Sequence, residues 1–257
     1  MRKLGTDRRR SLVNWAVDFI IVVAGVLLAL WLAELAEERR EARVRAETLE
    51  RVDEVIRRTV AMGISRIATA GCYRDRLAEL DRALQSSSDD WKGNPLPNLP
   101  ESMTRNSPFR FAYLADQLSV PHEVFDLAES SGTFAALPPD TRELYAGMRQ
   151  DVLWMSDAWQ HYERENISAL TLLGVDGKLD RAARFEMRKR LADMGVENQI
   201  TIARTRSLHR QMKEAGLELG PSDIARIRES VAFMNDIYGG CAEDIDPQTL
   251  EPRGAAN

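Results

Sequence analysis

The chain has 257 residues, of which 44% are hydrophobic and 29% charged, and its 40 acidic and 35 basic side chains give a formal net charge of −5. The part after Ala33 is long enough to bury a sizeable core without disulfide or metal staples. The acidic balance gives no support to nucleic-acid binding, which requires a basic surface.

An apolar stretch near the N-terminus predicts a membrane-spanning helix. Residues 19–33 carry no charged side chain, and extension back to Leu12 gives 22 residues, about 33 Å of helix. Because a hydrocarbon core is about 30 Å thick, this stretch can cross it. We expect a short basic cytoplasmic tail at residues 1–11 and a transmembrane helix at residues 12–35. A cleaved signal peptide is the main alternative, but no small-residue cleavage site follows the stretch.

One face of the expected span carries small and polar residues, namely Asp18, Gly25, Ala29 and Ala33. Small residues four apart let two helix backbones approach closely in lipid. The face therefore predicts a helix contact, in a homo-oligomer or with another membrane protein. The same spacing is also common by chance in membrane helices, and the alternative for Asp18 is an interfacial carboxylate near the headgroups.

Basic residues flank the span on both sides, so their number does not decide its orientation. Residues 1–10 carry five of them directly beside the span, whereas the arginines of residues 39–51 alternate with glutamates. We therefore expect a single-pass protein of the bacterial inner membrane, with its N-terminus in the cytoplasm and its C-terminal domain in the periplasm.

The two cysteines, Cys72 and Cys241, lack the C-x-x-C spacing of a metal or redox pair. In an oxidising compartment they could form one disulfide, and otherwise they would be two separate thiols. The sequence leaves both possibilities open, because pairing depends on geometry.

Residues 36–241 are expected to form an all-α domain. Apolar residues spaced three and four apart run from Leu49 to Leu84, and no proline precedes Pro95. The anchor should therefore continue into a long amphipathic helix, bent or interrupted near Gly63 or Gly71, which could link motions of anchor and domain. No useful length of sequence alternates as a strand would.

A polar, proline-rich loop occupies residues 86–108. We expect Trp91 and Leu96 to pack back and order part of it, either as a simple connector or as a binding segment. Two short helices should follow, at residues 111–118 and 121–130.

The next helix should begin just after Pro139, where residues 140–143 match a capping box. Its apolar residues repeat like a coiled-coil seam and predict either bundle core or the lining of a ligand pocket. The seam comprises Tyr145, Met148, Val152, Met155, Trp159 and Tyr162, and Trp154, Trp159 and Tyr162 are the candidate pocket residues.

Two further helices complete the expected domain. Residues 179–215, capped by Asp180, should form one that is broken at Gly195, and residues 221–238 the last. The tail at residues 242–257 is predicted to be disordered.

No catalytic or metal-binding motif is recognisable. The three histidines have no metal-ligand spacing, and neither a phosphate-binding glycine loop nor G-x-S-x-G occurs. We therefore expect a protein that is not an enzyme and that binds neither cofactor nor metal.

Residues 18–30, followed by a Glu/Arg-rich helix, and residues 125–132 resemble uncharacterised bacterial single-pass membrane proteins of the DUF6090-like type. The resemblance implies the same anchored architecture and no particular activity. Our leading hypothesis is a membrane-anchored extracytoplasmic helical protein that makes protein contacts. The alternative is a ligand-binding sensory bundle that acts through a membrane partner.

Overall fold

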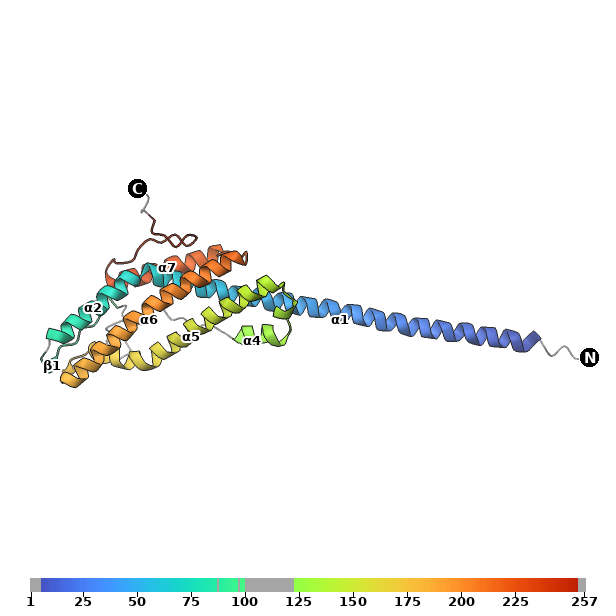
Figure 1. Cartoon of the computed structure of the whole chain (residues 1–257), viewed down its shortest axis with the longest axis horizontal. Helices are drawn as coiled ribbons and strands as arrows, with labels where there is room; N and C mark the ends of the chain where they lie inside the picture. Colours follow the sequence, from blue (N-terminus) through green and yellow to red (C-terminus); the bar gives the residue numbers. More distant parts are fainter. Residues whose placement is uncertain (1–5, 87, 97, 100–122, 254–257) are drawn as a thin grey trace, which may run out of the picture. The chain divides into compact units, whose positions relative to one another are not determined.

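The protein is almost entirely helical in the computed structural model, which describes residues 6–86, 88–96, 98–99 and 123–253. Of residues 6–18, 21, 159 and 161–172, only the backbone is described. The helices are α1 (Thr6–Ala68), α2 (Ala70–Ser86), α4 (Glu123–Ser130), α5 (Pro139–Leu173), α6 (Arg181–Glu214) and α7 (Pro221–Tyr238), with the 3-10 helix η1 (Phe134–Ala136) (Figure 1). The all-α prediction is confirmed. The chain divides into two compact units, Met1–Leu49 and Glu50–Asn257.

The first unit contains the N-terminal part of α1, whose apolar side chains are exposed. Ten large apolar side chains between Phe19 and Leu32 have 39% to 63% of their surface accessible. Within the described residues, no helix has a stretch long and apolar enough to cross a membrane. Residues 12–18 and Ile21 of the expected span lie outside the residues whose side chains are described.

In the second unit, the core is built from the apolar stripes of the helices. Residues of α1 spaced three and four apart are buried as predicted, among them Val52, Ile56, Val60 and Ile64. Helix α6 packs against both α5 and α2. It contributes Leu191, Met194, Leu208 and Met212 to the core.

The interruption expected at Gly63 or Gly71 falls between them, at Thr69. Helix α1 ends at Ala68 and α2 begins at Ala70, with Thr69 still donating to Ser65 at 3.0 Å. Gly63 instead lies inside α1, where an added Cβ would collide with the side chain of Thr205 on α6. The glycine therefore allows close helix packing rather than a bend.

The proline-rich loop is partly ordered in the way that the sequence predicts. Trp91 is 3% and Leu96 4% exposed, and the Trp91 indole donates to the carbonyl of Leu173 at 3.2 Å. The absence of strands was predicted wrongly. Strand β1 (Asp90–Trp91) pairs antiparallel with β2 (Gly177–Lys178), and two residues each are too few to show an alternating pattern.

The helices after this loop begin near the expected positions. Helix α4 ends before Gly132, which adopts a positive φ of 70°, and α5 begins at Pro139. The helix expected at residues 111–118 lies outside the described residues.

The predicted break of α6 at Gly195 is wrong, because the helix runs unbroken to Glu214. A glycine costs only about 1 kcal/mol inside a helix, and packing of α6 on two neighbours outweighs this. Its start is as predicted, since Asp180 accepts a hydrogen bond from the Ala183 amide at 2.8 Å. Helix α7 has the predicted bounds, Pro221–Tyr238.

The tail that was predicted to be disordered is ordered at residues 242–253. The Glu243 amide donates to the carbonyl of Ala68 at 2.8 Å, and Ile245 forms a β-bridge with Pro252. Ile245 is 7% exposed. The contact between Glu243 and Ala68 joins residues distant in sequence, so local composition could not reveal it. Residues 254–257 lie outside the described residues.

Candidate functional site

The small-residue face of the expected anchor is open to solvent. Gly25, Ala29 and Ala33 are all exposed, and a Cβ added at Gly25 would meet nothing within 4 Å. The side chain of Asp18 lies outside the described residues. A helix contact through this face therefore stays a prediction.

The seam of α5 divides into core and surface. Tyr145, Met148, Val152 and Met155 are at most 4% exposed and belong to the core. Trp154 is half-buried beneath the Arg204 guanidinium, 5.4 Å from its ring centroid, and it is not among the residues that line the two cavities described below. The side chains of Trp159 and Tyr162 lie outside the described residues.

Polar side chains of α5 are occupied in helix packing. Buried Asp151 accepts hydrogen bonds from Arg204 at 2.7 Å and Gln211 at 3.0 Å, both on α6. Tyr145 donates to Asp53 of α1 at 2.6 Å, and burial raises the pKa of both groups. Each of these groups faces a partner in the bundle, which is the arrangement of a structural link between helices.

The two cysteines are joined. Cys72 of α2 and Cys241 form a disulfide with their Cα atoms 5.2 Å apart. Gly239 and Gly240, at φ of 81° and 90°, turn the chain after α7 so that Cys241 reaches α2. The bond thus fixes the start of the C-terminal segment at residues 242–253.

A cavity of about 270 Å³ lies between α7 and the C-terminal segment. Its lining is mixed, with apolar groups beside two arginines and two carboxylates. The lining comprises Ala68, Ile227, Arg228, Val231, Ala232, Asn235, Ala242, Glu243, Asp244, Ile245, Pro247 and Arg253.

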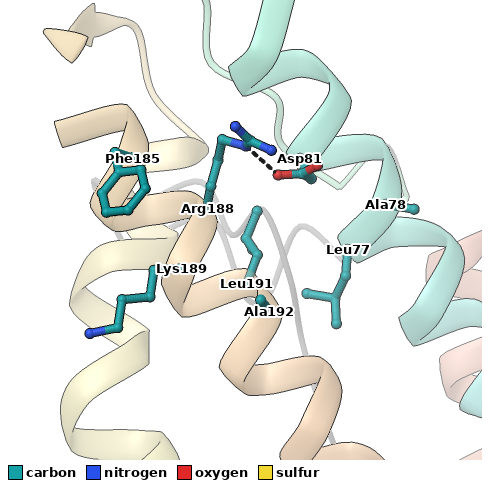
Figure 2. A pocket seen from close by; sticks show the side chains of 8 residues that line it. All are labelled: Leu77, Ala78, Asp81, Phe185, Arg188, Lys189, Leu191 and Ala192. Carbon is teal, nitrogen blue, oxygen red and sulfur yellow. Dashed lines mark hydrogen bonds and ion pairs between the residues drawn. The ribbon is translucent and has the colours of Figure 1, made fainter. Parts of the chain in front are cut away.

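A larger groove of about 530 Å³ lies between α2 and α6. Figure 2 shows Arg188 reaching from α6 to Asp81 on α2, where the two form an ion pair at 2.6 Å, and shows Leu77 and Leu191 between the helices. Phe185 and Lys189 project from α6 as well and belong to the lining of the same groove (Figure 2). The lining comprises Leu77, Ala78, Asp81, Phe185, Arg188, Lys189, Leu191 and Ala192.

Among the residues whose side chains are described, Phe185 is the most exposed large apolar one, at 69%. It lies four residues after Arg181 and four before Lys189, so the three side chains follow one face of α6. We call this row the basic strip. Within the described part of the chain, neither Arg181 nor Lys189 forms an ion pair, and both are exposed.

The exposed apolar surface continues along α6 beyond the basic strip. Val196 is 58% and Ile200 37% exposed, and Ala192 between them and Phe185 is also exposed. This surface was not predicted from the sequence, because a helix break was expected at Gly195. The signal was present in the four-residue spacing of Arg181, Phe185 and Lys189.

Among the described residues, no three or more His, Cys, Asp or Glu side chains lie together in a group that could hold a metal ion. Comparisons with protein-family models, with curated proteins and with solved structures found no match. The resemblance to DUF6090-like proteins therefore stays a prediction. The fold defines a helical-bundle domain, and one of its concave surfaces is the groove between α2 and α6.

Proposed function

We propose that this chain is a single-pass protein of the bacterial inner membrane whose periplasmic helical domain makes contacts with other proteins. The observation that carries the proposal is the exposure of ten large apolar side chains between Phe19 and Leu32. At about 25 cal/mol per Å² of apolar surface, leaving such a helix in water is costly, and lipid removes that cost.

The surroundings of this apolar segment support the proposal. Trp31 occurs near its C-terminal end, where aromatic rings favour the membrane interface. Charged residues follow, with exposed ion pairs of Arg40 with Glu37 and of Arg45 with Glu41, both at 3.9 Å. Pairs so exposed contribute little stability and are typical of a solvated helix.

A periplasmic location is supported by the disulfide between Cys72 and Cys241. Disulfides persist in oxidising compartments and are rare in the cytosol. The proposed protein contacts are supported by the exposed apolar face of α6, led by Phe185.

The test of the anchor is fractionation of cells that express the full chain, followed by protease treatment of intact spheroplasts. We expect the protein in the membrane fraction, resistant to carbonate extraction, with residues 50–257 degraded by the added protease. Recovery as freely soluble material would refute the anchor. Protection of the domain would refute the orientation.

Self-association through the Gly25 face is a further part of the proposal. Gly25→Leu adds a bulky side chain where the chain itself offers no contact within 4 Å, so its own fold should be unaffected. We expect this variant to lose chemical crosslinking between copies in membranes, whereas neighbouring Val26→Leu should retain it. Equal crosslinking in both variants would refute contact through this face.

The cavity beneath the C-terminal segment favours a second candidate function, the binding of a small ligand by a sensory bundle. Its volume of about 270 Å³ approaches that of small-molecule sites. Val231→Trp should fill it. Native mass spectrometry that finds a small molecule on the wild-type chain and none on this variant would support the candidate, and no adduct on either would refute it.

A further inference from the structure

We propose that the basic strip and the groove between α2 and α6 bind an acidic, amphipathic helix of a partner protein. The inference rests on the proposed function and specifies the chemistry of the partner. Between Arg181 and Leu191, α6 carries five basic residues, and Glu186 is the only acidic one.

Part of this charge is neutralised within the domain. Arg184 pairs with Asp89 at 2.8 Å, Arg188 with Asp81 at 2.6 Å and Arg190 with Glu186 at 3.3 Å. In the described part of the chain, Arg181 and Lys189 have no such partner. Two exposed cations on one helix face therefore remain available to an anion.

The apolar surface beside these cations requires that the partner also has an apolar face. Phe185, at 69% exposure, lies between them, and aromatic residues of this kind often dominate interface energies. The groove floor is apolar, since Leu77 and Leu191 are 7% and 3% exposed. Ala78 and Ala192 at its sides are small, so a helix backbone can approach closely.

A helix satisfies both requirements, because apolar residues at intervals of three and four would enter the groove while acidic residues beside them meet Arg181 and Lys189. A planar membrane surface fits less well. It would not fill a concave groove of about 530 Å³.

The test uses the full chain in phosphatidylcholine nanodiscs and two fluorescent helical peptides of about 18 residues, or five turns. Both peptides carry leucine at the same positions, and their remaining surface residues are glutamate in one and lysine in the other. We expect the glutamate peptide to bind, with affinity that falls as salt is raised, and the lysine peptide not to bind.

Variants locate the binding. Phe185→Ala should weaken binding of the glutamate peptide at least about tenfold, as loss of an aromatic anchor does. Lys189→Glu should weaken it and reduce its salt dependence. Matched controls are Phe233→Ala on α7, where Phe233 is 39% exposed, and Arg206→Glu elsewhere on α6, and both should bind as the wild type does.

Three results would overturn the inference. The two peptides could bind equally, or Phe185→Ala and Lys189→Glu could leave binding unchanged. Alternatively, phosphatidylglycerol vesicles could compete with the glutamate peptide at the same residues, which would make the surface a lipid-binding one. A photo-crosslinking residue at position 185 separates these failures from that of the proposed function. Protein adducts in cells without binding of the glutamate peptide would refute only the acidic partner.

Discussion

Removal of the disulfide between Cys72 and Cys241 should destabilise the helical domain of residues 50–257 substantially. The two cysteines are 169 residues apart in the sequence, so the bond closes most of the domain into one loop. A cross-link of this kind acts chiefly on the unfolded chain, whose conformational freedom it reduces. The perturbation we propose is Cys72→Ala combined with Cys241→Ala.

The chain-entropy estimate for a loop of 169 residues is about 5 kcal/mol at 25 °C. Measured effects are commonly about 2–4 kcal/mol, because unfolded chains retain structure. Hydrogen bonds of the C-terminal segment should keep the native structure in place when the disulfide is absent. The Ala242 amide donates to Asn235 at 2.9 Å and the Glu243 amide to Ala68 at 2.8 Å, so the C-terminal segment keeps two attachments. We therefore expect a loss of about 2–5 kcal/mol with the helical fold retained.

The assay is urea unfolding of the full chain in nanodiscs, followed by both circular dichroism and tryptophan fluorescence. Coincident transitions would justify a two-state free energy. The reduced wild-type protein is the matched control, because it keeps both sulfur atoms in the buried site around Cys72. If reduction and double substitution each changed stability by less than about 1 kcal/mol, the loop-closure argument would be refuted.

Three further predictions concern the packing of α6. Gly63→Ala should destabilise the domain by about 1–3 kcal/mol, since the new Cβ collides with Thr205, and Thr205→Ala should recover part of this in a double-mutant cycle of urea midpoints. Burial lowers the pKa of His209 below its ordinary value of 6.5, so the unfolded chain binds the proton more readily, and stability should fall as the pH drops below about 6.5. His209→Gln should flatten that dependence, measured as urea midpoints between pH 5 and 8, and parallel profiles would contradict the reasoning. Arg204→Met should cost about 1–3 kcal/mol in thermal or urea unfolding because it leaves buried Asp151 without its charged partner, and no loss would show that Gln211 suffices.

Helical periodicity was strong enough to predict most of the elements. Helix α7 begins at a proline and ends before two glycines, signals that act within a few residues, and its bounds match the prediction. The same applies to the cap of α6 by Asp180. Local signals gave a wrong prediction at Gly195. A glycine weakens an isolated helix, but α6 stays unbroken there because it packs against two neighbouring helices.

The candidate site was less accessible to sequence reasoning. The groove between α2 and α6 depends on which face of each helix is turned toward the other, and residues about 100 positions apart meet there, as Asp81 and Arg188 do. The spacing of Phe185 with Arg181 and Lys189 places it on a charged helix face, but its exposure was not predicted, since a phenylalanine at helical spacing is ordinarily a core residue.

By itself, the sequence determined the helical class of this protein and the apolar segment that we propose as its anchor, because helix period, caps and hydropathy are properties of neighbouring residues. Only the tertiary structure decided that Cys241 returns to Cys72, that residues 242–253 are ordered, and that Phe185 stays at the surface. These features depend on contacts between distant residues, whose free energy arises only when the helices pack.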